Sequence, residues 1–241
     1  MSLDTLDKDE IIQFSKLADD WWNEEGSMSF LHAMSKVRTR YIKESIIYNL
    51  QVSKNKRPLE GVEILDIGCG GGIASEPLAR MGGKLTSIDE SKELIRIAKL
   101  HAKAMHLDIK YRHSNIEEML KNKKKYDVVV ALELLEHVNN ISYFCKMLSK
   151  LIKPNGLIII STINRSLLSK MIVIKVAENI LKKIPVGTHN YKKFIRPIEI
   201  ENYFNIEGLN MFDLKGMVWD PIRNWRLSNN TSINYILTLK K

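Results

Sequence analysis

A glycine-rich turn, Asp66-Ile-Gly68-Cys-Gly70-Gly71-Gly72, comes directly after a short apolar segment and directly before a helical pattern. The apolar segment, 62–67, predicts a strand, and residues 74–81 predict a short helix. Glycine has no Cβ, so such a turn lets the chain reverse tightly and lets a ligand approach the backbone. This unit predicts the start of a parallel sheet with a ligand site at the carboxyl end of its first strand.

The alternation of strands and helices continues along the chain. We expect further strands at 84–88, 109–113, 126–132 and 157–162, helices at 91–106 and 141–152, and a turn at 154–156. Such alternation implies right-handed crossovers between parallel strands. Two later strands, near 210–216 and 232–239, would add an antiparallel hairpin. The prediction is therefore an α/β fold with a doubly wound, mostly parallel, seven-stranded sheet.

The 241 residues are expected to form a single domain with three parts. Residues 1–57 predict an N-terminal helical cap, with one amphipathic helix over 8–23 and a second running from a Ser35 cap to about residue 52. Residues 60–162 predict a cofactor-binding core. Residues 163–200 predict a basic amphipathic insertion that faces the substrate or a membrane.

Composition narrows the compartment and the partners. Cys69 and Cys145 are expected to be free thiols in a reducing cytoplasm. The acidic start of the chain lacks the apolar region of a secretory signal, and no uncharged apolar stretch reaches the length of a bilayer span. The formal net charge of +9 fits nucleic acid, an anionic membrane or a general lysine bias, because lysines are scattered along the whole chain.

The details of the glycine turn distinguish between ligands. A dinucleotide fingerprint would place glycine at position 73, which is Ile73, and the pattern instead uses Asp66, Gly68, Gly70 and Gly72. Asp89 follows 21 residues after Gly68, at the end of the second strand, where a carboxylate can accept hydrogen bonds from both ribose hydroxyls. The altered pattern favours a ligand without a pyrophosphate, such as S-adenosylmethionine. NAD and a purely structural turn remain as alternatives.

These residues resemble the class I S-adenosylmethionine methyltransferases, a Rossmann-like class, over roughly residues 60–162. The resemblance implies that Gly68 lies against the amino-acid part of the cofactor and that Asp89 binds its ribose. It also implies that Leu132 packs near the adenine or the methionine portion.

Glu133, Glu136 and His137 follow the fourth predicted strand. In a helix they would share one face, where two carboxylates and an imidazole could hold Mg²⁺ or Mn²⁺ or supply a general base. We expect His137 to act as base or ligand, with Glu133 and Glu136 as ligands or orienting groups. A solvated glutamate pair with a packed His137 is the alternative. The Asn/Asp-Pro-Pro-aromatic segment typical of base N-methyltransferases is absent here, which disfavours methylation of an exocyclic base amine.

Further motifs are similar to those of the ubiquinone biosynthesis O-methyltransferases. They are Ala18-Asp-Asp-Trp-Trp22, Arg38-Thr-Arg-Tyr-Ile42, Glu133–Val138, Ser161–Arg165, Gly187–Pro197 and Ile233-Asn-Tyr-Ile236. The resemblance implies O-methylation of polyprenylated phenol or catechol intermediates at both methylation steps, with Arg38 on the cofactor carboxylate. It also implies a Glu-Glu-His metal site as in some members. The family usually has Asn-Pro where this chain has Ser35-Lys36, which alters the entry to the helix that carries Arg38.

Residues 166–184 alternate apolar and basic side chains, including Lys170, Lys175, Lys182 and Lys183. These charges exclude a membrane-spanning helix but fit either an interfacial helix on anionic lipid or a helix that covers the sheet. With a polyprenylated substrate, we expect peripheral contact with the inner membrane and with other quinone-biosynthesis enzymes, and no nucleic acid. An RNA or other small-molecule methyltransferase and a non-catalytic membrane adaptor are the competing hypotheses.

Overall fold

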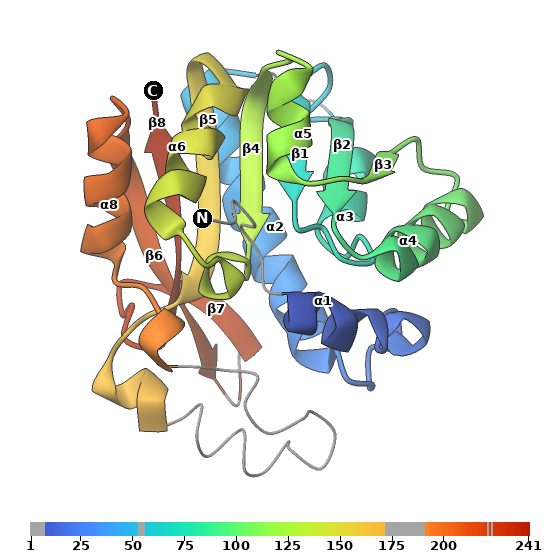
Figure 1. Ribbon diagram of the computed structural model, residues 1–241, viewed down its shortest axis with the longest axis horizontal. Helices are drawn as coiled ribbons and strands as arrows, with labels where there is room; N and C mark the ends of the chain where they lie inside the picture. Colours follow the sequence, from blue (N-terminus) through green and yellow to red (C-terminus); the bar gives the residue numbers. More distant parts are fainter. Residues whose placement is uncertain (1–7, 53–55, 172–190, 221, 223) are drawn as a thin grey trace.

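A mixed sheet of eight strands runs through the computed structural model, which describes residues 8–52, 56–171, 191–220, 222 and 224–241 (Figure 1). The strands are β1 (Glu63–Ile67), β2 (Lys84–Asp89), β3 (Lys110–His113), β4 (Tyr126–Leu132), β5 (Ile152–Ile163), β6 (Asn210–Asp220), β7 (Asn224–Ser228) and β8 (Asn234–Lys240). Their order across the sheet is β3-β2-β1-β4-β5-β8-β6-β7. The five strands β1 to β5 pair in parallel, and β8, β6 and β7 pair antiparallel. The predicted fold class is confirmed.

The strand order places the ligand crevice. The chain first builds outward from β1 through β2 to β3 and then returns to place β4 on the other side of β1. The loops after β1 and β4 therefore leave in opposite directions, and the crevice between them lies at the carboxyl ends of these strands. The glycine turn follows β1 at this point.

Helices cover both faces of the sheet. They are α1 (Lys8–Ser15), α2 (Ser29–Leu50), α3 (Ser75–Arg80), α4 (Lys92–Ala104), α5 (Ile116–Lys121), α6 (Ile141–Leu151) and α8 (Pro197–Ile206), with short 3₁₀ turns η1 (Ala18–Asp20), η2 (Leu135–His137) and η3 (Tyr191–Lys193). Strand side chains alternate between faces, so Leu65 and Val129 pack under α5, α6 and α8, whereas Ile64 and Val128 pack under α2 and α3. Figure 1 shows α2 behind the sheet and α6 in front of it.

The sheet has one strand more than the seven predicted. The additional strand is β7, which pairs only with β6 at the edge of the sheet and therefore buries few side chains. Its five residues carry too short an alternation to predict a strand from the sequence. The predicted turn at 154–156 lies inside β5 as an irregularity, where Asn155 has φ +61° and the pairing with β4 skips from Ile152 to Leu157.

The N-terminal predictions need two corrections. The single helix predicted over 8–23 is wrong, because α1 ends at Ser15 and the chain turns through η1 before Trp21. The second helix begins at Ser29 rather than at Ser35. Ser35 lies within α2, and its hydroxyl donates to the carbonyl of Ile73 at 3.4 Å. Most of the helix predicted over 166–184 lies outside the described residues, which include only its helical start at 167–171.

Candidate functional site

The glycine turn forms a tight loop at the end of β1. The backbone N–H groups of Gly68 and Cys69 both donate to the carbonyl of Ile88 in β2, at 2.9 and 3.0 Å. Gly70 has φ +53°, a conformation that favours glycine. A Cβ at Gly70 would lie 2.4 Å from Cζ2 of Trp21, so the absence of a side chain also makes room for this indole. The loop thus presents its backbone to the crevice and to the N-terminal segment.

Asp89 ends β2 beside this loop. Its Oδ2 accepts a hydrogen bond from the Gly70 N–H at 2.9 Å, and its Oδ1 accepts one from the Ser91 N–H at 2.8 Å. Desolvation raises the pKa of the Asp89 carboxyl, and the two N–H groups act in the opposite direction because they stabilise its charge. Each carboxylate oxygen can accept more than one hydrogen bond, so Asp89 fits the role of holding two ligand hydroxyls.

Asp66 lies beneath the loop rather than on its surface. It is 1% exposed, and Oδ2 accepts a hydrogen bond of 2.5 Å from the Ser75 hydroxyl, which also contacts the Ser87 hydroxyl at 2.9 Å. Burial raises the pKa of Asp66 to about 6, although the Ser75 hydrogen bond opposes this. In this position Asp66 fixes the end of β1 against α3 and so supports the loop from below.

Arg38 extends from α2 to the carboxyl end of β4. It is 4% exposed, and Nη2 donates to the Leu31 carbonyl at 2.9 Å while Nη1 lies 3.7 Å from Oε1 of Glu133. Desolvation lowers the pKa of Arg38, and the charges of Glu133, Asp66 and Glu136 oppose that shift. A guanidinium buried among carboxylates is an anion-binding group that can pair with a ligand carboxylate.

Glu133 and Glu136 follow β4 in a conformation that differs from the predicted helix. Glu133 has φ +49° and precedes the 3₁₀ turn η2, so Glu133, Glu136 and His137 do not share the face of an α-helix. The Ser161 hydroxyl donates to Glu133 and the Thr162 hydroxyl donates to Glu136, both at 2.6 Å. Burial and the charge of Glu133 raise the pKa of Glu136 to about 7.

His137 is half-buried, and its ring packs edge-on against Phe14 of α1 with centroids 5.3 Å apart. Leu132, the last residue of β4, is partly buried and packs against the apolar cluster under α2. Within the described ranges, no group of three His, Cys, Asp or Glu side chains is arranged to hold a metal ion. The Ser161 and Thr162 hydroxyls bind the two glutamates, and Arg38 lies beside Glu133. A metal held by Glu133, Glu136 and His137 stays a prediction.

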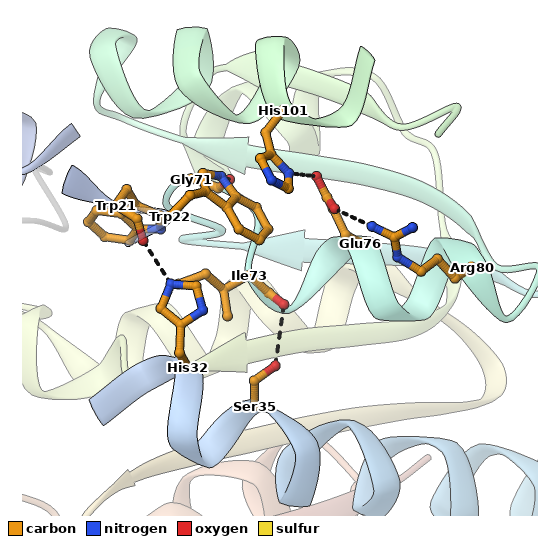
Figure 2. A network of polar contacts seen from close by, with 9 residues as sticks. All are labelled: Trp21, Trp22, His32, Ser35, Gly71, Ile73, Glu76, Arg80 and His101. Carbon is orange, nitrogen blue, oxygen red and sulfur yellow. Dashed lines mark hydrogen bonds and ion pairs between the residues drawn. The ribbon is translucent and has the colours of Figure 1, made fainter. Parts of the chain in front are cut away.

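The N-terminal segment closes over the loop from the other side. The Trp22 Nε1 donates to the carbonyl of Gly71 at 3.0 Å, and its ring stacks on His101 of α4 with centroids 3.5 Å apart and planes 6° apart (Figure 2). His101 Nδ1 lies 2.6 Å from Oε1 of Glu76, whose other oxygen pairs with Arg80 at 2.9 Å. Trp22 is therefore held by the glycine loop and by His101 of α4, and Glu76 of α3 positions His101.

Comparison with known proteins shows the family of the chain. Residues 65–160 match the family described as "Methyltransferase domain". The chain is 43% identical over 97% of its length to the ubiquinone biosynthesis O-methyltransferase of Pelagibacter ubique (strain HTCC1062), covering 98% of that protein. It is 41% identical to the protein of the same name from Rickettsia canadensis (strain McKiel), covering 99% of both chains. This chain belongs to the ubiquinone biosynthesis O-methyltransferase family.

The fold of this O-methyltransferase also matches solved structures. Magnesium protoporphyrin IX methyltransferase from Synechocystis PCC 6803 with bound SAH superimposes with a TM-score of 0.68 and 18% identity, over 97% of this chain and 100% of that one. At this identity the likeness shows the fold alone. It agrees with the mostly parallel sheet and its antiparallel C-terminal strands.

In this O-methyltransferase the predicted residues lie at the carboxyl ends of the parallel strands. Gly68, Gly70 and Gly72 line the loop after β1 and Asp89 ends β2, while Leu132 and Glu133 lie at the end of β4. Sequence reasoning did not identify Ser161 and Thr162 as site residues. The signal for them was present, because two hydroxyl side chains directly follow the apolar run 157–160, all of which is buried. Trp21 and Trp22 belong to the motif Ala18–Trp22, to which the sequence alone assigns no role.

Proposed function

We propose that this protein methylates hydroxyls of polyprenylated phenol or catechol intermediates in ubiquinone biosynthesis, using S-adenosylmethionine, at both O-methylation steps. The observation that carries the proposal is identity of about 40% over nearly the whole chain to relatives that bear this name. The residues at the carboxyl ends of the parallel strands fit a ligand that has an adenosine part and an amino-acid part. Asp89 offers acceptors for sugar hydroxyls, Arg38 offers a buried cation for a carboxylate, and the loop offers backbone without side chains.

Bound S-adenosylmethionine supplies a methyl group activated by a positively charged sulfur. The chain must then hold the acceptor hydroxyl in line and remove its proton, because a free phenol has a pKa of about 10 and is a weak nucleophile near neutrality. The raised pKa of Glu136, about 7, suits a carboxyl that accepts this proton at neutral pH. We propose His137 as the alternative proton acceptor, with Glu133 orienting its neighbours through Ser161 and Arg38.

The proposal is tested by incubating the purified chain with S-adenosylmethionine and a demethylated quinol that carries a short isoprenoid tail. Mass spectrometry should show a product heavier by one methyl group. Cells that lack the chain should accumulate unmethylated quinone precursors. Methyl transfer from labelled cofactor to RNA, with none to the quinol, would instead support an RNA methyltransferase, and cofactor binding without any turnover would support a non-catalytic adaptor.

The assignment of the base and the metal has its own test. Full activity in His137→Ala would exclude His137 as the base. Chelation that leaves turnover unchanged would exclude a catalytic Mg²⁺ or Mn²⁺ held by Glu133, Glu136 and His137, and restoration by one added metal would identify that ion.

We also propose that residues 163–200 contact an anionic membrane and form part of the entrance for the polyprenylated substrate. Leu167 and Met171, at the start of this segment, are 77% and 56% exposed, and Lys170 lies between them. Exposed apolar side chains beside lysines fit an interfacial segment, which other enzymes of the pathway could share. Among the helices in the described part of the chain, none combines the length and hydropathy that crossing a bilayer would need.

Charge reversal tests the membrane contact. Lys182→Glu with Lys183→Glu should weaken cosedimentation with vesicles that contain anionic lipid. Lys99→Glu with Lys103→Glu, two exposed positions on α4, is the matched control and should leave binding unchanged. Equal vesicle binding by both double variants would count against a membrane-facing role for the segment.

A further inference from the structure

Trp21 lies directly on the glycine loop. It is 5% exposed, and its indole is so close to the loop that a Cβ at Gly71 would lie 2.3 Å from Cδ1 and one at Gly70 would lie 2.4 Å from Cζ2. Gly70 is the residue whose N–H binds Asp89. The indole therefore sits next to the carboxylate that fits the ligand's sugar, on the backbone that the ligand must approach.

The indole N–H of Trp21 lacks a hydrogen-bond acceptor among the described residues. Its Nε1 atom is buried. A buried indole N–H usually finds an acceptor, because leaving a desolvated donor unpaired is costly. The loop beside it offers backbone to a bound molecule, so an acceptor atom of that molecule can satisfy the indole.

The neighbouring residues hold Trp21 in this position. The carbonyl of Trp21 lies 2.9 Å from Nε2 of His32 in α2 (Figure 2). The next residue, Trp22, is fixed by its hydrogen bond to Gly71 and by its stack on His101. The backbone of Trp21 is thus held from α2 on one side and, through Trp22, from the loop and α4 on the other, which restricts where the indole can lie.

We propose that Trp21 is a cofactor-contacting residue: its indole covers the glycine loop, and its Nε1–H donates to an oxygen or nitrogen of bound S-adenosylmethionine or its demethylated product, S-adenosylhomocysteine. Trp22 is a positioning residue that docks the N-terminal segment on the loop. The identity of the ligand in this inference rests on the proposed function. The inference assigns the cofactor a contact from the N-terminal segment, which is not part of the sheet.

Calorimetry with S-adenosylhomocysteine tests the contact with Trp21. Trp21→Phe keeps an aromatic ring but removes the N–H, and should raise Kd about three- to tenfold. Trp21→Ala also removes the cover and should raise Kd by about tenfold or more. Trp219→Phe is the matched control, because Trp219 is 61% exposed on β6, and it should bind as the unaltered chain does.

Two further measurements separate a contact from a general loss of structure. In the unaltered chain, S-adenosylhomocysteine should change the tryptophan fluorescence, and Trp21→Phe should lose most of that change. Trp22→Phe keeps the stack on His101 but loses the hydrogen bond to Gly71. It should raise KM for S-adenosylmethionine about threefold while kcat at saturation stays within about twofold, because an indirect role affects binding rather than the chemical step.

The outcomes are distinguishable. If the unaltered chain binds S-adenosylhomocysteine and Trp21→Phe and Trp21→Ala bind equally well or more tightly, the inference is wrong. Tighter binding would mean that Trp21 occupies the ligand's place. If Trp21→Ala fails to fold, as judged by its melting curve, Trp21→Phe alone decides. If the unaltered chain binds no adenosyl ligand at all, the proposed function fails and the inference with it.

Discussion

Replacing Asp66 by asparagine should remove a pH dependence of folding. Asp66 is 1% exposed, and burial raises its pKa from 3.8 to about 6 in the folded chain. Between these values the folded state therefore holds a proton that the unfolded state has already released. The contribution of Asp66 to stability is thus greatest below pH about 4 and falls as pH rises through about 6. A shift of about 2 pH units corresponds to about 3 kcal/mol, of which roughly 2 kcal/mol develops between pH 4.5 and 7.5.

The measurement is urea unfolding of the unaltered chain and of Asp66→Asn across that pH range. Asparagine keeps an oxygen that can accept the Ser75 hydrogen bond but cannot ionise. The other buried carboxyls are common to both proteins, so the difference in unfolding free energy isolates Asp66. The variant should gain roughly 2 kcal/mol relative to the unaltered chain as pH rises from 4.5 to 7.5. A difference that stays constant with pH would refute the raised pKa of the buried Asp66 carboxyl.

Three further results are expected. Asp89→Asn should raise Kd for S-adenosylhomocysteine about 10- to 100-fold in calorimetry, because both carboxylate oxygens accept backbone N–H groups and an amide has only one acceptor oxygen. Asp108→Asn, in the exposed connection before β3, should leave Kd unchanged. Gly71→Ala should cost about 1–3 kcal/mol in urea unfolding through its contact with Trp21, and clearly less in a Trp21→Ala background, whereas additive costs would contradict the packing. Methylation by the unaltered chain should rise as pH increases through about 7, and Glu136→Gln should be about 100-fold slower without that limb; an unchanged profile would exclude Glu136 as the base.

The parallel half of the fold could be predicted from the sequence because its signals are local. The strands are short apolar runs, and the glycine turn and Asp89 mark the ends of two of them. The edge strand β7 could not be predicted, because a strand that buries little carries little pattern. The break between α1 and Trp21 was also missed, since the spacing of Phe14 and Ala18 continues a helical period that only the docking on the loop interrupts.

The candidate site was predicted in part for the same reason. Residues that end a strand, such as Asp89 and Glu133, can be assigned to one edge of the sheet from the strand pattern alone. Glu133 has φ +49° and forms hydrogen bonds with Ser161, which lies 28 residues away in the sequence. The contact between Trp21 and Gly70 spans a longer gap in the chain, and no spacing rule predicts it.

The position of β8 affects how the chain can fold during synthesis. β8 lies between β5 and β6, so residues 164–233 must all leave the ribosome before the edge of β5 can be paired. Until then the nascent chain presents the buried run Leu157–Ile160 on an open strand edge, a surface that invites aggregation. A premature stop before Asn234 would therefore leave the cofactor half of the sheet translated but exposed, and would separate β6 and β7 from it.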